Sequence, residues 1–224
     1  MTDTGLNDVA LDLVREAGEW HLLGLLLQCP TPGWRERVRE LQANTADAEL
    51  RRVAQDAITE ASEPLYHTTL GPGGPAAPRE VSYRRHLQPG QFLAQLATIY
   101  EAFAYHPVLD EPLDHVASEV GFVGYLRFKE AYAHCAQQPE SAAACRDAVR
   151  RFTEDHLAYL AEPLAASLES SGIVYLAAAA KWLAARVGPA PQHAAAMEEL
   201  PVLAGDCLEG CAALESTSDE EALS

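Results

Sequence analysis

Hydrophobic residues recur every three to four positions over most of the chain, which is the spacing of one face of an α-helix. The pattern is clearest near the N-terminus, at Leu11, Val14, Gly18, Leu22, Leu25 and Leu26. It predicts a first helix over about residues 7–29, ended by Pro30 and Pro32. The alternating pattern of a β-strand is hard to find anywhere in the sequence.

The same spacing predicts further helices beyond the first. They are expected at about residues 34–42, 47–69, 89–105, 112–137, 141–169 and 173–187, with a weaker one near 193–200. Pro64 and Pro163 are expected to kink or divide two of these helices, because proline lacks the backbone N–H of the helical ladder. Pro112 suits a first helical turn, where that N–H has no partner anyway.

A dense run of glycine and proline over residues 71–78 interrupts this pattern, and no regular element is expected there. We therefore predict a single all-α domain of roughly seven to nine helices with a Gly/Pro-rich central loop. Its expected divisions are N-terminal helices in residues 1–70, the loop in 71–88, a main helical part in 89–204, and an acidic, disordered tail in 205–224.

Charge narrows the range of partners. The 224 residues are 48% hydrophobic and include 33 acidic against 16 basic residues, a formal net charge of −17. Nucleic acid is therefore not an expected partner, because phosphate backbones require a basic face, and an anionic membrane surface is disfavoured for the same reason. A basic peptide would be attracted instead.

The sequence also predicts a compartment. The N-terminus lacks the basic and apolar segments of a secretory signal, and no apolar run reaches the roughly 20 residues needed to span a bilayer. A cytoplasmic protein without membrane insertion is expected. Five cysteines, an odd number, then indicate reduced thiols. Cys207 and Cys211 lack the further ligands that a structural zinc site needs nearby, so we expect them to pack as small apolar side chains.

The densest polar cluster spans residues 110–119. Acids at the start of a helix complement its positive dipole end, which is a sufficient structural reason for most of them. His115 and Glu119 are four residues apart and could pair on one helix face, either as an acid/base couple or as half of a metal site. The sequence supplies no nucleophile or further ligand beside them. We predict no catalytic residue, no metal and no cofactor.

The order of several segments resembles a known family. The segments are Leu65-Tyr66, Glu80-Val81-Ser82-Tyr83, Tyr100 to Phe103, the block Glu-Pro-x-Asp-His-x-x-x-Glu at residues 111–119, and Phe152 to Leu157. Together they resemble the TorD/DmsD/NarJ family of molybdoenzyme assembly chaperones, over roughly residues 15–185. Residues 124–132 resemble the group that serves dimethyl sulfide, selenate, chlorate or ethylbenzene oxidoreductases.

The resemblance implies an all-helical cytoplasmic chaperone that is not an enzyme. Family members bind the catalytic subunit of a molybdoenzyme before export, often through its twin-arginine signal peptide. They hold it while the bis-molybdopterin guanine dinucleotide cofactor is inserted, and they occur as monomers or helix-swapped dimers. Carried over to this sequence, the client-binding region falls on Glu111, Pro112, Asp114, His115 and Glu119, flanked by Tyr66, Ser82 and Tyr83.

Our hypothesis is that Asp114, with Glu111 or Glu119, binds the arginines of the signal peptide, because a carboxylate accepts two hydrogen bonds from a guanidinium. Helix faces within residues 89–130 would supply an apolar groove. His115 would orient a carboxylate, or tune release by titrating near neutral pH. Two other functions stay open: a helical adaptor with an unrelated partner, and a metal-dependent helical enzyme that uses His115, Glu119 and His156.

Overall fold

The computed structural model describes residues 3–84, 87–107 and 111–191, without the side chains of residues 3–7. This part of the chain contains helices and no strand, and its one isolated β-bridge joins Arg79 to His115. The prediction of an all-α fold is confirmed. The expected helix near 193–200, the tail and both cysteines of that region lie outside the described residues, so the boundary near residue 204 stays a prediction.

The helices follow one another with short connections. They are α1 (Asp3–Leu26), α2 (Trp34–Asn44), α3 (Ala48–Glu60), α4 (Glu63–Thr69), the 3₁₀ turn η1 (Glu80–Tyr83), α5 (Pro89–Ala102), α6 (Val116–Cys135), α7 (Pro139–Phe152), the π turn η2 (Thr153–Leu157), α8 (Ala158–Ser171) and α9 (Val174–Val187). In the described part of the chain none of them combines the length and apolar character that spanning a bilayer requires.

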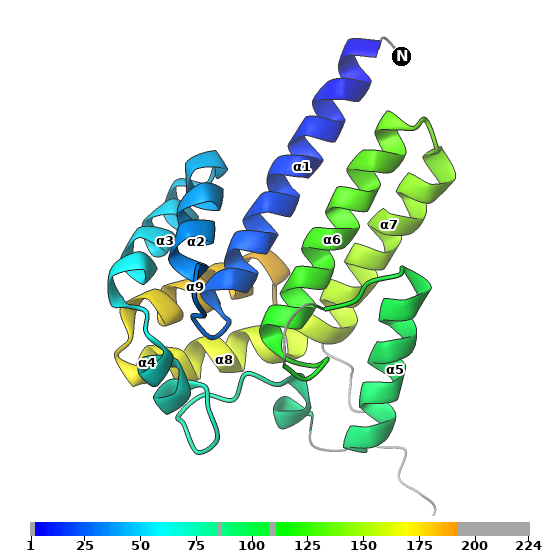
Figure 1. Cartoon of the computed structure of the whole chain (residues 1–224). Coiled ribbons are helices and arrows are strands. Elements are labelled where there is room, and N and C mark those ends of the chain that lie inside the picture. Colours follow the sequence, from blue (N-terminus) through cyan, green and yellow to red (C-terminus); the bar gives the residue numbers. More distant parts are fainter. Residues whose placement is uncertain (1–2, 85–86, 108–110, 192–224) are drawn as a thin grey trace, which may run out of the picture. The chain divides into compact units, whose positions relative to one another are not determined.

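Helices α1 and α6 pack along each other more extensively than any other pair of described elements (Figure 1). Glycines allow this close approach. A Cβ on Gly124 would lie 3.1 Å from Cβ of Trp20 and 3.2 Å from the carbonyl oxygen of Ala17, and a Cβ on Gly24 would lie 3.5 Å from the carbonyl oxygen of Ala117. The crossing therefore has no room for larger side chains at Gly124.

Helices α3 and α9 also pack against α1, and α8 packs against α9 (Figure 1). The alanine-rich helix α9 buries Ala179 and Ala180, and its Trp182 meets Trp20 of α1 edge-on at 5.9 Å between ring centroids. The fully buried leucines Leu22, Leu23, Leu26 and Leu27 complete this core. Of the predicted α1 pattern, Leu22, Leu25 and Leu26 are buried, whereas Leu11 and Val14 are exposed.

Three helix boundaries differ from the expected ones. The helix expected over 47–69 is divided at residues 61–62, where Ser62 caps α4 and Pro64 occupies its first turn. The helix expected over 141–169 changes register at the π turn η2, whereas Pro163 lies inside α8. Finally, α6 begins at Val116 and not at Pro112, because the side chain of His115 caps the helix there.

The glycines of the α1–α6 crossing give a matched test. A methyl group on Gly18 of α1 would meet open space, whereas one on Gly124 would press against Trp20 and Ala17. We expect Gly18→Ala to raise the free energy of unfolding by up to about 1 kcal/mol, because alanine loses less backbone entropy in a helix. Gly124→Ala should lower it, because the helices must separate. Urea denaturation of both variants checks this, and equal effects of the two would contradict the packing described.

Candidate functional site

The segment between the Gly/Pro-rich loop and α5 lies against the start of α6. We call residues 78–84 the strap. Its backbone pairs with the residues before α6: the amide of Glu80 donates to the carbonyl of Asp114 (2.9 Å), and the amide of Val116 donates to the carbonyl of Pro78 (2.8 Å). Two segments that are 35 residues apart in the sequence, at Arg79 and Asp114, thereby meet. The motif of residues 111–119 is one side of this junction.

Asp114 is completely buried and is paired within the chain. Nε and Nη2 of Arg79 both lie 2.9 Å from its Oδ1, and its Oδ2 accepts the amide of Val81 (3.3 Å). The aspartate therefore ties the side chains of the strap to α6, as the backbone bonds tie the main chain. In this arrangement a further guanidinium can reach its carboxylate only if Arg79 moves away.

Glu80 is the second buried carboxylate at this junction. Its Oε1 accepts from Nε of Arg84 (2.7 Å), and its Oε2 lies 3.0 Å from Nδ1 of His156 in η2. Burial raises the pKa of Glu80, but the hydrogen bond and charge of His156, with smaller contributions from Glu119 and then Arg84, outweigh it and hold the pKa below its usual range. The π turn presents His156 to this carboxylate and stacks its ring on Phe152 at 4.6 Å.

Glu119 is the third buried carboxyl group. Neither of its carboxyl oxygens has a hydrogen-bond partner within hydrogen-bonding geometry among the described residues. Burial, followed by the charge of neighbouring Glu80, raises its pKa well above the usual value. We expect Glu119 to carry a proton at neutral pH. A protonated Glu119 would be a neutral group beside Glu80 and would form no ion pair with an arginine.

His115 links the start of α6 to the surface. Its Nδ1 accepts the amide of Ala117 (3.1 Å) and so caps α6. Nε2 then carries the proton of the neutral ring and donates to the hydroxyl of Tyr66 (2.9 Å), which in turn donates to Oε1 of Glu111 (3.4 Å). Burial, followed by the charge of Arg79, lowers the pKa of His115 to about 4. The histidine is therefore a neutral cap.

These contacts correct three expectations. His115 does not pair with Glu119, because its ring bonds to Ala117 and Tyr66. It does not titrate near neutral pH, because it is buried beside a guanidinium. The helix does not start at Pro112, because residues 112–115 form a turn that brings Asp114 to Arg79, and the ring of His115 makes the cap.

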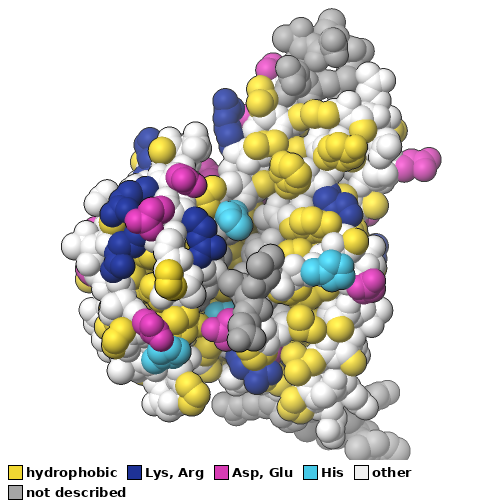
Figure 2. Space-filling view, in the orientation of Figure 1, with side chains coloured by type: hydrophobic (Ala, Val, Ile, Leu, Met, Phe, Trp, Pro, Cys, Tyr) yellow, Lys and Arg dark blue, Asp and Glu magenta, His cyan; other side chains and the backbone are white. Residues whose placement is uncertain are grey.

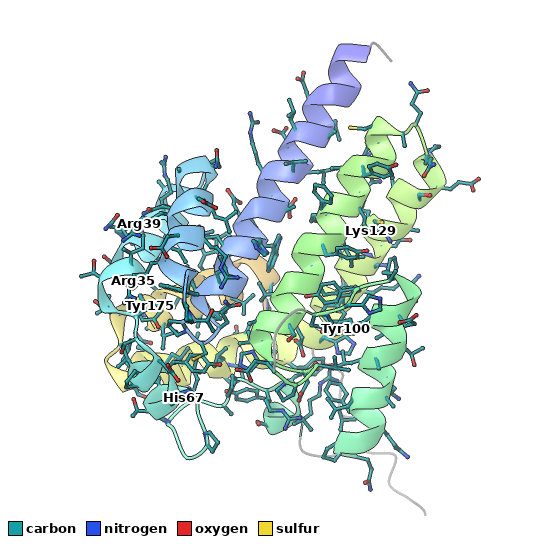
Figure 3. The ribbon with its side chains drawn as sticks, viewed as in Figure 1. Arg35, Arg39, His67, Tyr100, Lys129 and Tyr175 are labelled. Atoms are coloured by element: carbon teal, nitrogen blue, oxygen red, sulfur yellow. The ribbon has the colours of Figure 1, made fainter. Side chains whose placement is uncertain are left out.

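The predicted site residues divide between surface and interior. Pro112 and Ser82 are exposed, and Glu111 and Tyr83 are half-buried. Tyr66, Asp114, His115 and Glu119 are buried behind them. Tyr100 of α5, labelled in Figure 3, donates to the carbonyl of Leu113 (3.0 Å) and holds the turn from the other side. The structure thus brings all eight residues to one region but leaves only four of them open to solvent.

An apolar groove of about 780 Å³ lies between α1 and α6. Val14, Gly18 and Leu25 belong to its α1 wall, and Tyr125 and Phe128 belong to its α6 wall. Arg37 and Leu41 of α2 also line the groove. Figure 2 shows hydrophobic side chains gathered over these helices. Among the described residues seven large hydrophobic side chains are exposed, and five of them lie on α1 or α6: Val9, Leu11, Val14, Phe128 and Tyr132. Such a cluster is typical of an interaction surface.

Sequence reasoning missed two parts of this region. It placed the groove within residues 89–130, whereas α1 supplies one whole wall. It also gave Arg79 no role. Within the described residues, no group of three or more His, Cys, Asp or Glu side chains could hold a metal ion. His156, which the alternative of a metal enzyme requires beside His115 and Glu119, is bonded to Glu80 instead.

Comparison with known proteins decides the family. A family model described as the nitrate reductase delta subunit matches residues 29–166, which is more than half of the chain. The chain belongs to this family. The nitrate reductase delta subunits are members of the TorD/NarJ group of redox-enzyme maturation chaperones, so the resemblance seen in the sequence is confirmed. No curated protein and no solved structure matched the chain.

Replacement by glutamine should change the free energy of unfolding differently at Glu80 and at Glu119. Glu80→Gln leaves the partners Arg84 and His156 without a carboxylate, so we expect the free energy of unfolding to fall by roughly 3 kcal/mol. Glu119→Gln replaces a protonated acid by a neutral group of the same shape, so we expect a change below about 1 kcal/mol at pH 7. Urea denaturation measures both. A larger loss in Glu119→Gln would place the proton on Glu80 instead.

His115 should make stability depend on pH. The folded protein holds its pKa near 4, and the unfolded chain near 6.5, so on acidification the unfolded state takes up a proton first. The free energy of unfolding should therefore fall by about 2 kcal/mol between pH 7 and pH 5 through this group. His115→Asn keeps a capping side chain without a titrating ring and should lose that part of the slope. Parallel slopes of both proteins in urea denaturation would contradict this.

Proposed function

We propose that the protein is a cytoplasmic chaperone without enzymatic activity. It binds the catalytic subunit of a molybdoenzyme, including a twin-arginine signal peptide. It holds this client while a bis-molybdopterin guanine dinucleotide cofactor is inserted before export. The family match over residues 29–166 carries the proposal, because that family belongs to the maturation chaperones. A net charge of −17 favours a basic client segment.

The groove between α1 and α6 supports a helical contact with the client. Between Val14 and Leu25, the α1 wall of the groove rises about 17 Å at 1.5 Å per residue, which suits a client helix of about three turns. Val14, Phe128 and the glycine floor at Gly18 offer apolar contacts along this length. We assign the apolar part of the signal peptide to this groove, where it would pack as a third helix against two.

The motif of residues 111–119 would serve the basic part of the client. Glu111 and Pro112 are its accessible members, with Ser82 and Tyr83 beside them on the strap. Asp114, His115 and Glu119 hold this surface in place from inside, through Arg79, the cap of α6 and Glu80. We propose that Glu111 contacts one arginine of the client. Whether the protein acts as a monomer or a helix-swapped dimer stays a prediction.

The test is capture of the client from the native host. Tagged protein should recover a molybdoenzyme catalytic subunit that still carries its signal peptide, as identified by mass spectrometry. Gly18→Leu fills the groove and should reduce capture at least about tenfold, because the displaced apolar contact is worth more than 1.4 kcal/mol.

Gly90→Leu is the matched control for this variant. A Cβ on Gly90 of α5 also meets open space, but Gly90 lies outside the groove. Its capture should equal that of the wild type. If no molybdoenzyme subunit is recovered from cells that are making one, the proposed function is wrong. If Gly18→Leu captures the subunit normally, only the assignment of the groove is wrong.

A further inference from the structure

We propose that Asp114 is a guanidinium-binding site that the chain fills with its own Arg79, and that an arginine of the client takes the place of Arg79. The inference rests on the proposed function, because it assumes a client that carries paired arginines. It adds an exchange step. In the free protein Asp114 is paired with Arg79, and in the client-bound protein it is paired with an arginine of the client.

The exposure of the two partners points to this exchange. The Asp114 side chain is 0% exposed, whereas the Arg79 side chain is 36% exposed. Both contacting nitrogens of Arg79 approach the same oxygen of Asp114 at 2.9 Å. The guanidinium therefore lies on the solvent side of a carboxylate that water does not reach. A second guanidinium that arrives from solvent meets Arg79 first.

The strap does not depend on the Arg79 side chain for its position. Its main chain is held by the bonds of Glu80 to Asp114 and of Val116 to Pro78, and the hydroxyl of Tyr83 donates to the carbonyl of Ala77 (2.7 Å). Glu80 anchors it further through His156. Arg79 can consequently change rotamer while the backbone stays in place, which is a fast local motion for a partly exposed side chain.

The chemistry of the exchange favours arginine over lysine. A buried carboxylate left unpaired is unstable, so Asp114 must exchange one partner directly for another. A client guanidinium offers the same planar set of donors as Arg79, whereas an ammonium is a point charge with different geometry. Glu111, three residues earlier and half-buried, is open to the second arginine of a pair. The competing Arg79 would reject isolated basic residues, because they cannot engage both carboxylates.

The test uses the full chain and two synthetic peptides, which carry an Arg-Arg or a Lys-Lys pair before the same apolar segment. Arg79→Ala removes the internal competitor and should bind the Arg-Arg peptide about tenfold more tightly than the wild type. The Lys-Lys peptide should gain much less. Arg52→Ala is the control, since Arg52 is an exposed arginine of α3 that pairs only loosely with Glu49 (3.9 Å). Its affinity should not change.

The gain must also depend on Asp114. In the double variant Arg79→Ala with Asp114→Asn the tighter binding should disappear, and the Arg-Arg peptide should raise the melting temperature of Arg79→Ala more than that of the wild type. Unchanged or weaker binding by folded Arg79→Ala overturns the proposal, and so does a gain that survives in the double variant.

A further variant covers the case in which Arg79→Ala does not fold. Arg79→Lys keeps a positive charge beside Asp114 but lacks the fork of donors, so it should fold and bind the Arg-Arg peptide more tightly than the wild type. Equal or weaker binding overturns the proposal. Client capture by the wild type separates the two hypotheses: if the subunit is captured but neither Arg79 variant tightens binding, the exchange is wrong and the proposed function stands.

Discussion

Three carboxyl groups buried at one junction constrain the architecture around them. Asp114 and Glu80 each form an ion pair with an arginine, whereas Glu119 has no such partner and its raised pKa favours the protonated form. Arg79 of the strap reaches Asp114 before α6, and Arg84 pairs with Glu80 within the strap. His156 reaches Glu80 from the π turn before α8. Main-chain hydrogen bonds set the path of the strap, and these side-chain pairs join the strap to the start of α6 and to the π turn before α8.

The sequence predicted the elements whose signals are local. Helical periodicity predicted the helix α1, although the pattern positions Leu11 and Val14 are exposed, and the density of glycine and proline predicted the irregular loop at residues 71–78. It did not predict the π turn, since the need to bring His156 to Glu80 joins residues 76 apart. Pro163 was the only local signal for a division there, and it is accommodated within α8. Long-range pairing overrode local propensity at this point.

For the site, the motif located the right region but not the right roles. A pattern of acids and histidine at helical spacing indicates which residues share a face, not which of them are buried. His115 and Glu119 were expected to pair because a helix was expected from Pro112. Because α6 begins at Val116, His115 is the N-cap of the helix and does not lie on the same helix face as Glu119. Arg79, which forms the ion pair with Asp114, lies outside the motif.

The two parts of the proposed client-binding region, the strap junction and the groove, lie in different parts of the sequence. The family match begins at Cys29, just after α1, so the strap junction lies inside the matched region while the α1 wall of the groove lies outside it. The width of the groove is set where the α1 and α6 backbones approach closely at Gly24 and Gly124, and Gly18 leaves its floor open. If the proposed function holds, a chain can keep the carboxylate junction, proposed to bind a basic pair, and vary the α1 wall, proposed to bind the apolar segment after it. Specificity for one client among related enzymes would then reside in α1.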